Sequence, residues 1–537
     1  MNLLDEPWLP VRDAEGNRRW VTPAGLADPT LMAFDADRAD FNGALAQFAI
    51  GLLQTVTPAE SAQEWRELFR HPPCADTLAG WFAPIREVFD LDGDGARFMQ
   101  DRVMVAKDGI TKDIGVLLIE APGEQTIKNN ADHFIKRDQI AALCPGCAAT
   151  ALFTLQINAP TGGVGHLTGL RGGGPLTTIV GCQPARSLWH DLWLNVQDSK
   201  VFLEHSGDQA RKELHLTFPW QVDITEFQKE SRELAPIQLH PAHVFWAMPR
   251  RIRLDFDYTS AGPCGICMRH SDRLIRRYVT LNYGLNYKGP WDHPLTPYYQ
   301  NKADWLPMHP QPGGIGYRHW LGWVLGAATD ANRHLRSARV VTHLRNHRGR
   351  DLEGQLRLWA FGYDMDNMKA RCWYEARLPL YGLAACEPEA QRRVEEMVRP
   401  WLAGANLTAS FLRAAVKAAW FDVEARGDLS AVDASFWSRT EPIFYRQLSK
   451  VIERARADED IDASTFATGW LEHLREVALD LFDGQFVGAG AIERQNPRRT
   501  AEAYRQFKRK LGGKKIHEAL GLPAPAKVGT AETDSVH

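Results

Sequence analysis

The sequence predicts an α+β protein, with a mixed N-terminal domain that carries long loops and a zinc knuckle, followed by a C-terminal four-helix bundle. Three observations lead to this fold class. Short apolar runs broken by Gly, Pro and Asn extend to about residue 380, helical periodicity takes over from about residue 385, and two Cys-x-x-C pairs lie in the first part. We therefore expect domains at residues 1–380 and 385–515, with a disordered tail at 523–537.

The first domain combines helical and strand-like segments. Residues 42–53 and 61–69 carry apolar side chains at helical spacing and predict two helices. The short runs Ile179-Val180 and Val340-Val-Thr342 are typical of strands, and the Gly, Pro and Asn residues between such runs indicate loops.

The second domain shows helical periodicity throughout. Three glycines, Gly404, Gly427 and Gly484, are expected to end helices there. The predicted helices cover residues 388–402, 406–425, 434–455 and 464–482, with a basic helix at 497–511.

Composition limits the classes of function. Apolar residues make up 44% of the 537 residues and charged residues 24%, which is typical of an ordered globular protein. The net charge of -3 gives no overall attraction to a polyanion, so contacts with nucleic acid would need local basic patches, such as residues 333–350 and 498–510. No run approaches the ~20 apolar residues of a membrane span. We expect a cytoplasmic protein with no membrane partner.

Four of the eight cysteines form two Cys-x-x-C pairs, Cys144 with Cys147 and Cys264 with Cys267. Each pair presents two thiolates from one turn, and two pairs complete the tetrahedral set that holds a structural zinc ion. Two alternatives stay open from the pattern alone: four reduced thiols without a metal, or a redox-active pair.

Glycines are concentrated at residues 161–165 and 171–174. Such bare backbone can approach a phosphate or a base edge, and Lys128, Lys136 and Arg137 just upstream would add positive charge. The spacing matches neither a Walker loop nor a dinucleotide fingerprint. Ordinary turns and tight packing are the alternative interpretation.

An enzymatic alternative is a metal-dependent nuclease acting on DNA. Asp364 and Asp366, with His343 or His347, could provide its ligands. The chain has no H-E-x-x-H, nucleophile elbow or phosphate-binding lysine loop, so the sequence favours a noncatalytic protein.

Taken in order along the chain, these features resemble the CasA family, the large subunit of the type I-E CRISPR surveillance complex Cascade. The similarity covers nearly the whole chain. The motifs that carry it are Asn2-Leu-Leu-Asp-Glu-Pro-Trp-Leu-Pro10, Phe98-Met-Gln100, Leu143-Cys-Pro-Gly-Cys-Ala148, Ala159-Pro160, Gly169-Leu-Arg-Gly-Gly173, Thr177-Thr178, Trp291-Asp-His-Pro294 and Gly362-Tyr363.

The resemblance implies a noncatalytic subunit that recognises the protospacer-adjacent motif in duplex DNA, promotes duplex opening and R-loop formation, and recruits a helicase-nuclease. Guide-RNA pairing then supplies the long sequence specificity. The implied partners are the small and backbone subunits of Cascade, the CRISPR RNA including its 5′ end region, double-stranded target DNA and the helicase-nuclease. The resemblance also assigns the four cysteines to a structural zinc ion.

The resemblance further implies DNA-binding residues. In this family a glycine loop and a neighbouring strand approach the motif from the minor groove, and they correspond here to Thr161, Gly162 and Gly163 and to Asn282. Lys288 is the alternative for the lysine that relatives carry near Asn282.

Two more elements are expected to contact DNA. A wedge hairpin pries the duplex open, and its tip corresponds to Asn367, Met368 and Lys369. A loop before the first knuckle, residues 129–137, resembles the family's loop that contacts DNA and docks on the guide RNA, with Phe134 and Lys136 as its contacting residues.

Overall fold

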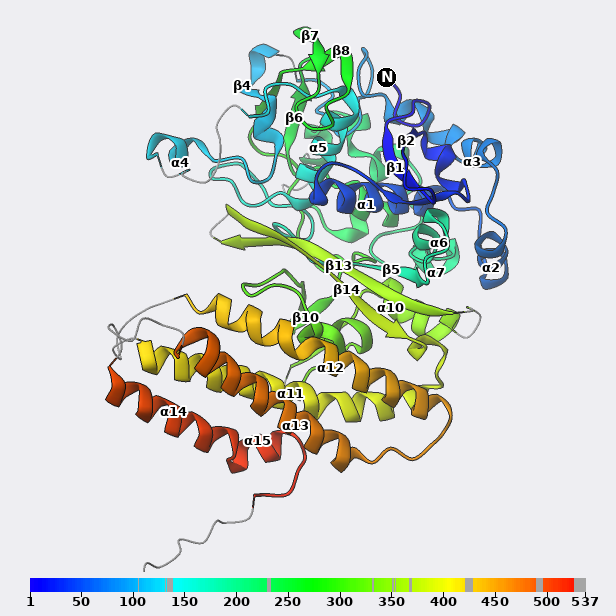
Figure 1. The fold of residues 1–537 in the computed structure, drawn as a ribbon. Helices are drawn as coiled ribbons and strands as arrows, with labels where there is room; N and C mark the ends of the chain where they lie inside the picture. Colours follow the sequence, from blue (N-terminus) through cyan, green and yellow to red (C-terminus); the bar gives the residue numbers. More distant parts are fainter. Residues whose placement is uncertain are drawn as a thin grey trace, which may run out of the picture. The chain divides into compact units, whose positions relative to one another are not determined.

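The computed structural model describes residues 1–104, 106–130, 132, 139–228, 233–330, 333–349, 352, 354–366, 369–420, 428–488 and 496–525. The chain divides into two compact units, one formed by Met1–Gln311 and Arg336–Leu380 and the other by Pro312–Leu335 and Tyr381–His537 (Figure 1). The predicted α+β class with a C-terminal helical region is confirmed. From residue 526 onward, the predicted disordered tail lies outside the described residues.

The core of the first unit is built around helix α1, Ala39–Val56, which confirms the helix predicted at residues 42–53. Helix α5, Pro145–Asn158, packs against it. Phe48 of α1 makes edge-on contacts with ring centroids 5.4 to 6.1 Å away, and this geometry stabilises aromatic pairs beyond their buried area. The rings around Phe48 are Trp8, Phe89, Phe98, Phe153 and Trp246.

The second predicted helix is α2, Ala62–Arg70, and its start is held by a capping box. Ser61 accepts the backbone N–H of Glu64, while the Glu64 carboxylate accepts that of Ser61. The strand expected at Val340 is wrong: the run lies in helix α10, Arg339–His343. Val340 is buried, so tertiary packing outweighs the β preference of its branched side chain.

A long hairpin dominates the main sheet of the first unit, and it is visible in Figure 1. Strand β13, Gln355–Asp366, lies between β14, Lys369–Tyr381, and β5, Thr177–Gln183. The antiparallel pairing of β13 with β5 runs from Gln355 opposite Gln183 to Phe361 opposite Thr177. The last five residues of β13 therefore extend beyond the β5 pairing.

The structure also contains smaller sheets. One has the antiparallel order β4-β9-β6, with β4 at Ile110–Asp113, β9 at Arg277–Leu281 and β6 at Arg251–Leu254. Strands β7, Thr259–Pro263, and β8, His270–Ile275, form a hairpin that holds the second cysteine pair between them. The remaining strands are β1 Leu9–Asp13, β2 Arg18–Val21, β3 Leu31–Phe34, β10 Tyr298–Asn301, β11 Asp304–Pro307 and β12 Leu335–Arg336.

Short helices complete the first unit and lie mostly in its long loops. They are α3 Ala75–Phe82, α4 Glu124–Lys128, α6 Leu188–Trp193, α7 Ser199–Leu203, α8 Leu214–Thr217 and α9 Thr225–Gln228.

The second unit is helical, and α11, Pro388–Trp420, packs against the other helices of this unit. Those helices are α12 Ser430–Arg456, α13 Ala463–Asp480, α14 Pro497–Leu511 and α15 Lys514–Ala519. The bounds of α14 match the predicted basic helix. None of the described helices combines the length and apolar character that a bilayer span requires.

Two of the predicted helix ends in this unit are wrong. Gly404 lies inside α11, where the absence of a Cβ allows Leu520 to approach closely. Gly484 lies within a π-helical continuation of α13, Leu481–Phe486. Both glycines have helical backbone, so their role is close packing or a widened turn and not termination. Gly427 lies outside the described residues.

Candidate metal centre and nucleic-acid interface

The first cysteine pair lies at the start of α5. Leu143 and Ile275 of β8 exchange backbone hydrogen bonds of 2.9 and 2.8 Å, which fix the chain just before Cys144. Cys144 is the N-cap of α5, and its sulfur accepts the backbone N–H of Cys147 at 3.5 Å. One turn of helix therefore presents both sulfurs on the same side.

The second pair is carried by the turn between β7 and β8. The backbone N–H of Cys264 donates to the carbonyl of Arg269 at 2.9 Å, and that of Gly265 donates to Ala142 at 2.9 Å. The Cys264 sulfur accepts the backbone N–H of Cys144 at 3.3 Å. These bonds join the two turns although 116 residues separate Cys147 from Cys264.

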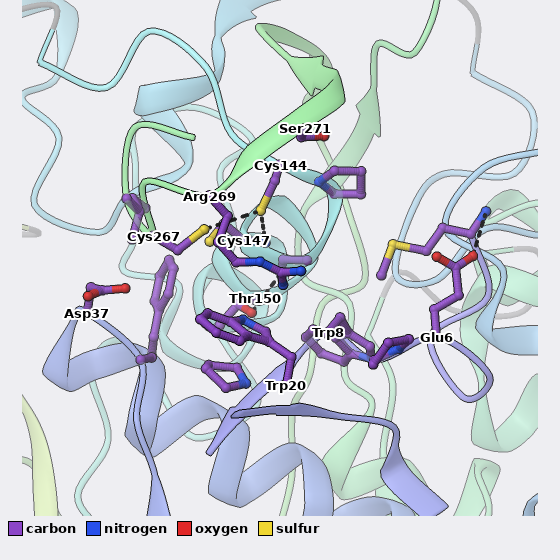
Figure 2. Close-up of a pocket in the computed structure, with 18 of the residues that line it drawn as sticks. Glu6, Trp8, Trp20, Asp37, Cys144, Cys147, Thr150, Cys267, Arg269 and Ser271 are labelled. Atoms are coloured by element: carbon purple, nitrogen blue, oxygen red, sulfur yellow. Dashed lines mark hydrogen bonds and ion pairs between the residues drawn. The ribbon is translucent and has the colours of Figure 1, made fainter. Parts of the chain in front are cut away.

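All four sulfurs lie within 4.8 Å of one another, and those of Cys144 and Cys267 are 3.7 Å apart. A tetrahedral zinc ion with Zn–S bonds of ~2.3 Å requires sulfurs about 3.8 Å apart, so this donor set fits it. Figure 2 shows the sulfurs of Cys144, Cys147 and Cys267 turned toward one another. These three cysteines line a cavity of about 310 Å³. The four cysteines can therefore hold a metal ion. The structure brings together the two pairs that the sequence predicted to form one site.

The electrostatics of the cluster favour a bound cation. Hydrogen bonding to Cys144 raises the pKa of Cys147 well above its ordinary value, while hydrogen bonds from Cys144 and Cys147 lower the pKa of Cys264. Four thiolates within 4.8 Å of one another would repel each other, so without an ion they cannot all ionise. A divalent cation removes this conflict because it stabilises every thiolate at once.

An arginine lines the cavity beside the cysteine cluster. The guanidinium carbon of Arg269, just after the second pair, lies 4.3 Å from the ring centroid of Trp20. Figure 2 shows the two side chains next to each other. This cation–π contact joins the cysteine turn to strand β2.

The glycine loop at residues 161–165 is exposed at its tip. Thr161, Gly162 and Gly163 are exposed, and Val164 is 79% exposed. Gly163 has a φ of +87°, and a Cβ there would have no neighbour within 4 Å. The tip is therefore free to meet a partner along its backbone.

The structure brings this loop against the chain that follows β9. The backbone N–H of Tyr283 donates to the Gly165 carbonyl at 2.8 Å, and a Cβ on Gly165 would lie 2.5 Å from that of Asn282. Asn282 is exposed beside the loop, so two predicted DNA-binding elements share one surface. Lys288 is exposed six residues later, where its backbone N–H donates to Leu234 at 2.9 Å.

Sequence reasoning missed Arg250, which lies beneath this loop. Its side chain donates to the carbonyl of Pro160, and one guanidinium nitrogen would lie 3.2 Å from a Cβ on Gly162. Arg250 is 7% exposed, and its Nε and Nη1 have no hydrogen-bond partner among the described residues. Burial lowers its pKa to about 10, so it stays charged at neutral pH. No local pattern distinguishes it from the adjacent Arg251.

The predicted wedge is the end of the β13–β14 hairpin. Near that end, the buried Asp364 forms an ion pair of 2.6 Å with Arg371 of β14. Lys369, the first residue of β14, is exposed. The other two tip residues, Asn367 and Met368, lie outside the described residues, as do Phe134 and Lys136 of the loop before the first knuckle.

The groups proposed for a nuclease are separated. Asp364 and Asp366 both face Arg371, at 2.6 and 3.6 Å, whereas the acidic neighbour of His343 is Asp198 at 3.9 Å. Among the described residues, the group of three or more side chains close enough to share a metal ion is the cluster of four cysteines. The geometry thus offers no support for a metal site at these aspartates.

Comparison with known proteins decides the family. The family of CRISPR-associated protein Cse1 matches residues 2–481 of this chain. The chain belongs to the Cse1 family. This confirms the resemblance to CasA, since one solved relative is described under both names.

Solved Cse1 structures share the fold across their whole length. Thermus thermophilus CasA (Cse1) is 18% identical, with 97% of this chain and 99% of that chain covered and a TM-score of 0.67. Thermobifida fusca Cse1 is 15% identical, with 97% and 98% covered and a TM-score of 0.69. A chain in a CRISPR RNA-guided surveillance complex is 16% identical, with 95% and 99% covered and a TM-score of 0.65.

Proposed function

We propose that this chain is the noncatalytic large subunit of a type I-E CRISPR RNA-guided surveillance complex. In this role it recognises the protospacer-adjacent motif in duplex DNA, promotes opening and R-loop formation, and recruits the helicase-nuclease. Membership of the Cse1 family and the shared fold of a chain from such a surveillance complex support the proposal. Its partners would be the small and backbone subunits, the CRISPR RNA near its 5′ end, and target DNA.

The observation that carries motif recognition is the single surface made by the glycine loop and Asn282. The exposed glycine backbone of the loop fits a narrow minor groove, where the amide of Asn282 can add a hydrogen bond to a base edge. Arg250 beneath the loop supplies positive charge at the same place, although the net charge of the whole chain is -3. This chain can therefore attract DNA phosphates locally while its overall affinity for DNA stays weak.

The metal would be a structural zinc ion, because four cysteine sulfurs would complete its tetrahedral ligand set and leave no open position for chemistry. The position of the cysteine cluster indicates what the ion would stabilise. Helix α5 starts at the first cysteine pair and ends at Asn158, three residues before Thr161, while β8 and β9 run from the second pair to Leu281, next to Asn282. The ion would thus tie together the two segments that lead to the proposed DNA-reading surface.

The test is duplex binding by guide-RNA complexes assembled with and without this chain, on targets that carry or lack candidate motifs. We expect a gain in affinity that requires both the chain and the motif. An unchanged affinity would identify a structural adaptor. Cleavage of DNA by the isolated chain, dependent on a divalent metal, would instead establish the nuclease alternative.

A matched pair of variants tests the loop itself. Gly163→Leu should weaken binding to motif-bearing duplex and leave pairing with single-stranded target intact. Gly16→Leu is the control, since Gly16 has the same backbone strain at φ +88° and equally open surroundings, in the turn between β1 and β2. Equal losses on duplex and single strand for Gly163→Leu would mean that the loop is only structural.

A further inference from the structure

A second cavity in the first unit, of about 660 Å³, shares no lining residue with the glycine loop or with Asn282. It is lined by the chain before α2, by α7 and by α10 with the π-helical turn that follows, Leu344–Arg348. Its volume falls within the range of small-molecule sites, roughly 300 to 1,000 Å³. The basic side chains that line it are Lys200, His205, Arg339, His343, His347 and Arg348.

The basic residues on α10 recur at helical spacing. Arg339, His343 and His347 are each four residues apart, so they lie along one side of the continuous α10 and π-helical segment. These residues belong to the basic run at residues 333–350, and in the structure they line the cavity.

Arg339 is the central observation. Its side chain is 9% exposed, and none of its three guanidinium nitrogens has a hydrogen-bond partner among the described residues. Its ion-pair partner is Asp292, at 3.8 Å, and that carboxylate also pairs with Arg336 at 3.0 Å. A buried cation without hydrogen bonds is costly, so an anionic ligand would satisfy what the protein leaves open.

The buried side chains that line the cavity carry a net positive charge. Asp198 pairs with Arg348 at 2.5 Å and lies 3.9 Å from His343, whose Nε2 also has no hydrogen-bond partner in the described chain. Asp292 and Arg336 do not line the cavity, so its buried charges are one carboxylate, Asp198, and two guanidinium groups, those of Arg339 and Arg348. The remaining acids, Glu60 and Glu204, are exposed at the rim, where solvent screens them.

We propose that this cavity binds a phosphoryl group, with Arg339 as the principal donor and His343 as the second. The planar guanidinium fork matches the geometry of phosphate oxygens and can bind two of them at once. A phosphoryl ligand could be free phosphate or the terminal phosphate of a nucleic-acid strand. The inference does not depend on the proposed recognition of the adjacent motif.

Calorimetric titration of the full chain with inorganic phosphate, at constant ionic strength, tests the site. We expect saturable binding of one phosphate per chain that weakens at least tenfold in Arg339→Gln and several-fold in His343→Gln. The matched control is Arg86→Gln, in which an arginine with a 53% exposed side chain is neutralised. No saturable binding, or equal binding by Arg339→Gln and the unmodified chain, would overturn the proposal.

Competition identifies the source of the phosphoryl group. A tetranucleotide with a 5′-phosphate should displace bound phosphate if the ligand is a strand end, and its 5′-hydroxyl counterpart should not. If neither displaces it, the ligand is free phosphate. Thermal melting of each variant without phosphate shows that it is folded, and His343→Gln keeps the test decisive if Arg339→Gln does not fold.

Discussion

The Tyr283 backbone N–H donates a 2.8 Å hydrogen bond to the Gly165 carbonyl and so joins the glycine loop to the end of β9. Each partner leads back along the chain to a different cysteine pair, one through α5 and the other through β8 and β9. The cysteine cluster and the proposed DNA-reading surface thus lie at opposite ends of the same two segments.

Gly165→Ala should destabilise the first unit more than Gly163→Ala. Both positions have a left-handed backbone, which costs a non-glycine residue about 1 kcal/mol or more. Gly165 adds a clash, because the new Cβ would lie 2.5 Å from that of Asn282, whereas Gly163 faces open space. Overpacking of this kind costs about 1–3 kcal/mol, measurable by urea unfolding. Equal losses in the two variants would show that Asn282 moves freely.

Removal of the metal should unfold the link between the two cysteine turns. We expect one zinc ion per chain by elemental analysis, and we expect Cys264→Ser to lose it and to melt at a lower temperature. Cys74→Ser is the control, since Cys74 is exposed and far from the cluster in sequence. An unmodified chain that contains no metal, or a Cys264→Ser variant with unchanged metal content, would contradict the assignment.

Gly404→Ala should destabilise the second unit. A Cβ at Gly404 would lie 2.4 Å from the Cδ2 of Leu520, so α11 and the chain after α15 would have to separate, at a cost of about 1–3 kcal/mol. Gly469 of α13 is exposed and has no neighbour within 4 Å of its added Cβ. Gly469→Ala should therefore stabilise the protein by about 0.5–1 kcal/mol through helix propensity alone. Denaturant unfolding of the pair should show opposite signs.

Stability should fall below pH 6.5 because His243 is buried in its neutral form. Burial lowers its pKa to about 3, and its nitrogens contact the Tyr287 hydroxyl at 3.0 Å and the Leu216 carbonyl at 3.1 Å. Protonation then favours the unfolded chain, whose histidine has an ordinary pKa of about 6.5. The contribution is complete above pH 6.5 and is lost as pH falls toward 3, by about 2 kcal/mol at pH 5.

Melting temperatures at pH 7, 6 and 5 measure this loss. His243→Gln cannot titrate, so its melting temperature should fall less steeply with pH, although its value at pH 7 is lower. His71→Gln, at a side chain that is 73% exposed, should keep the slope of the unmodified protein. Parallel profiles for His243→Gln and the unmodified chain would show that another group controls the acid sensitivity.

Local sequence patterns were sufficient to predict those elements whose apolar spacing and caps lie within a single segment. Helices α1, α2 and α14 were predicted because their apolar spacing and caps are encoded within a few residues. The pairing of Cys144 and Cys147 with Cys264 and Cys267 was also predicted, since four thiols of this spacing favour one metal ion.

The remaining features depend on contacts between distant segments. Gly404 has the same local signature as a helix stop, but Leu520 determines that it is a packing glycine. Arg250 carries no distinguishing signal in the sequence, and Arg339 is one residue of a basic run. Only the folded chain buries their side chains and leaves guanidinium nitrogens that have no hydrogen-bond partner among the described residues. Burial and partner choice arise from residues far apart along the chain, and no pattern within a single segment contains that information.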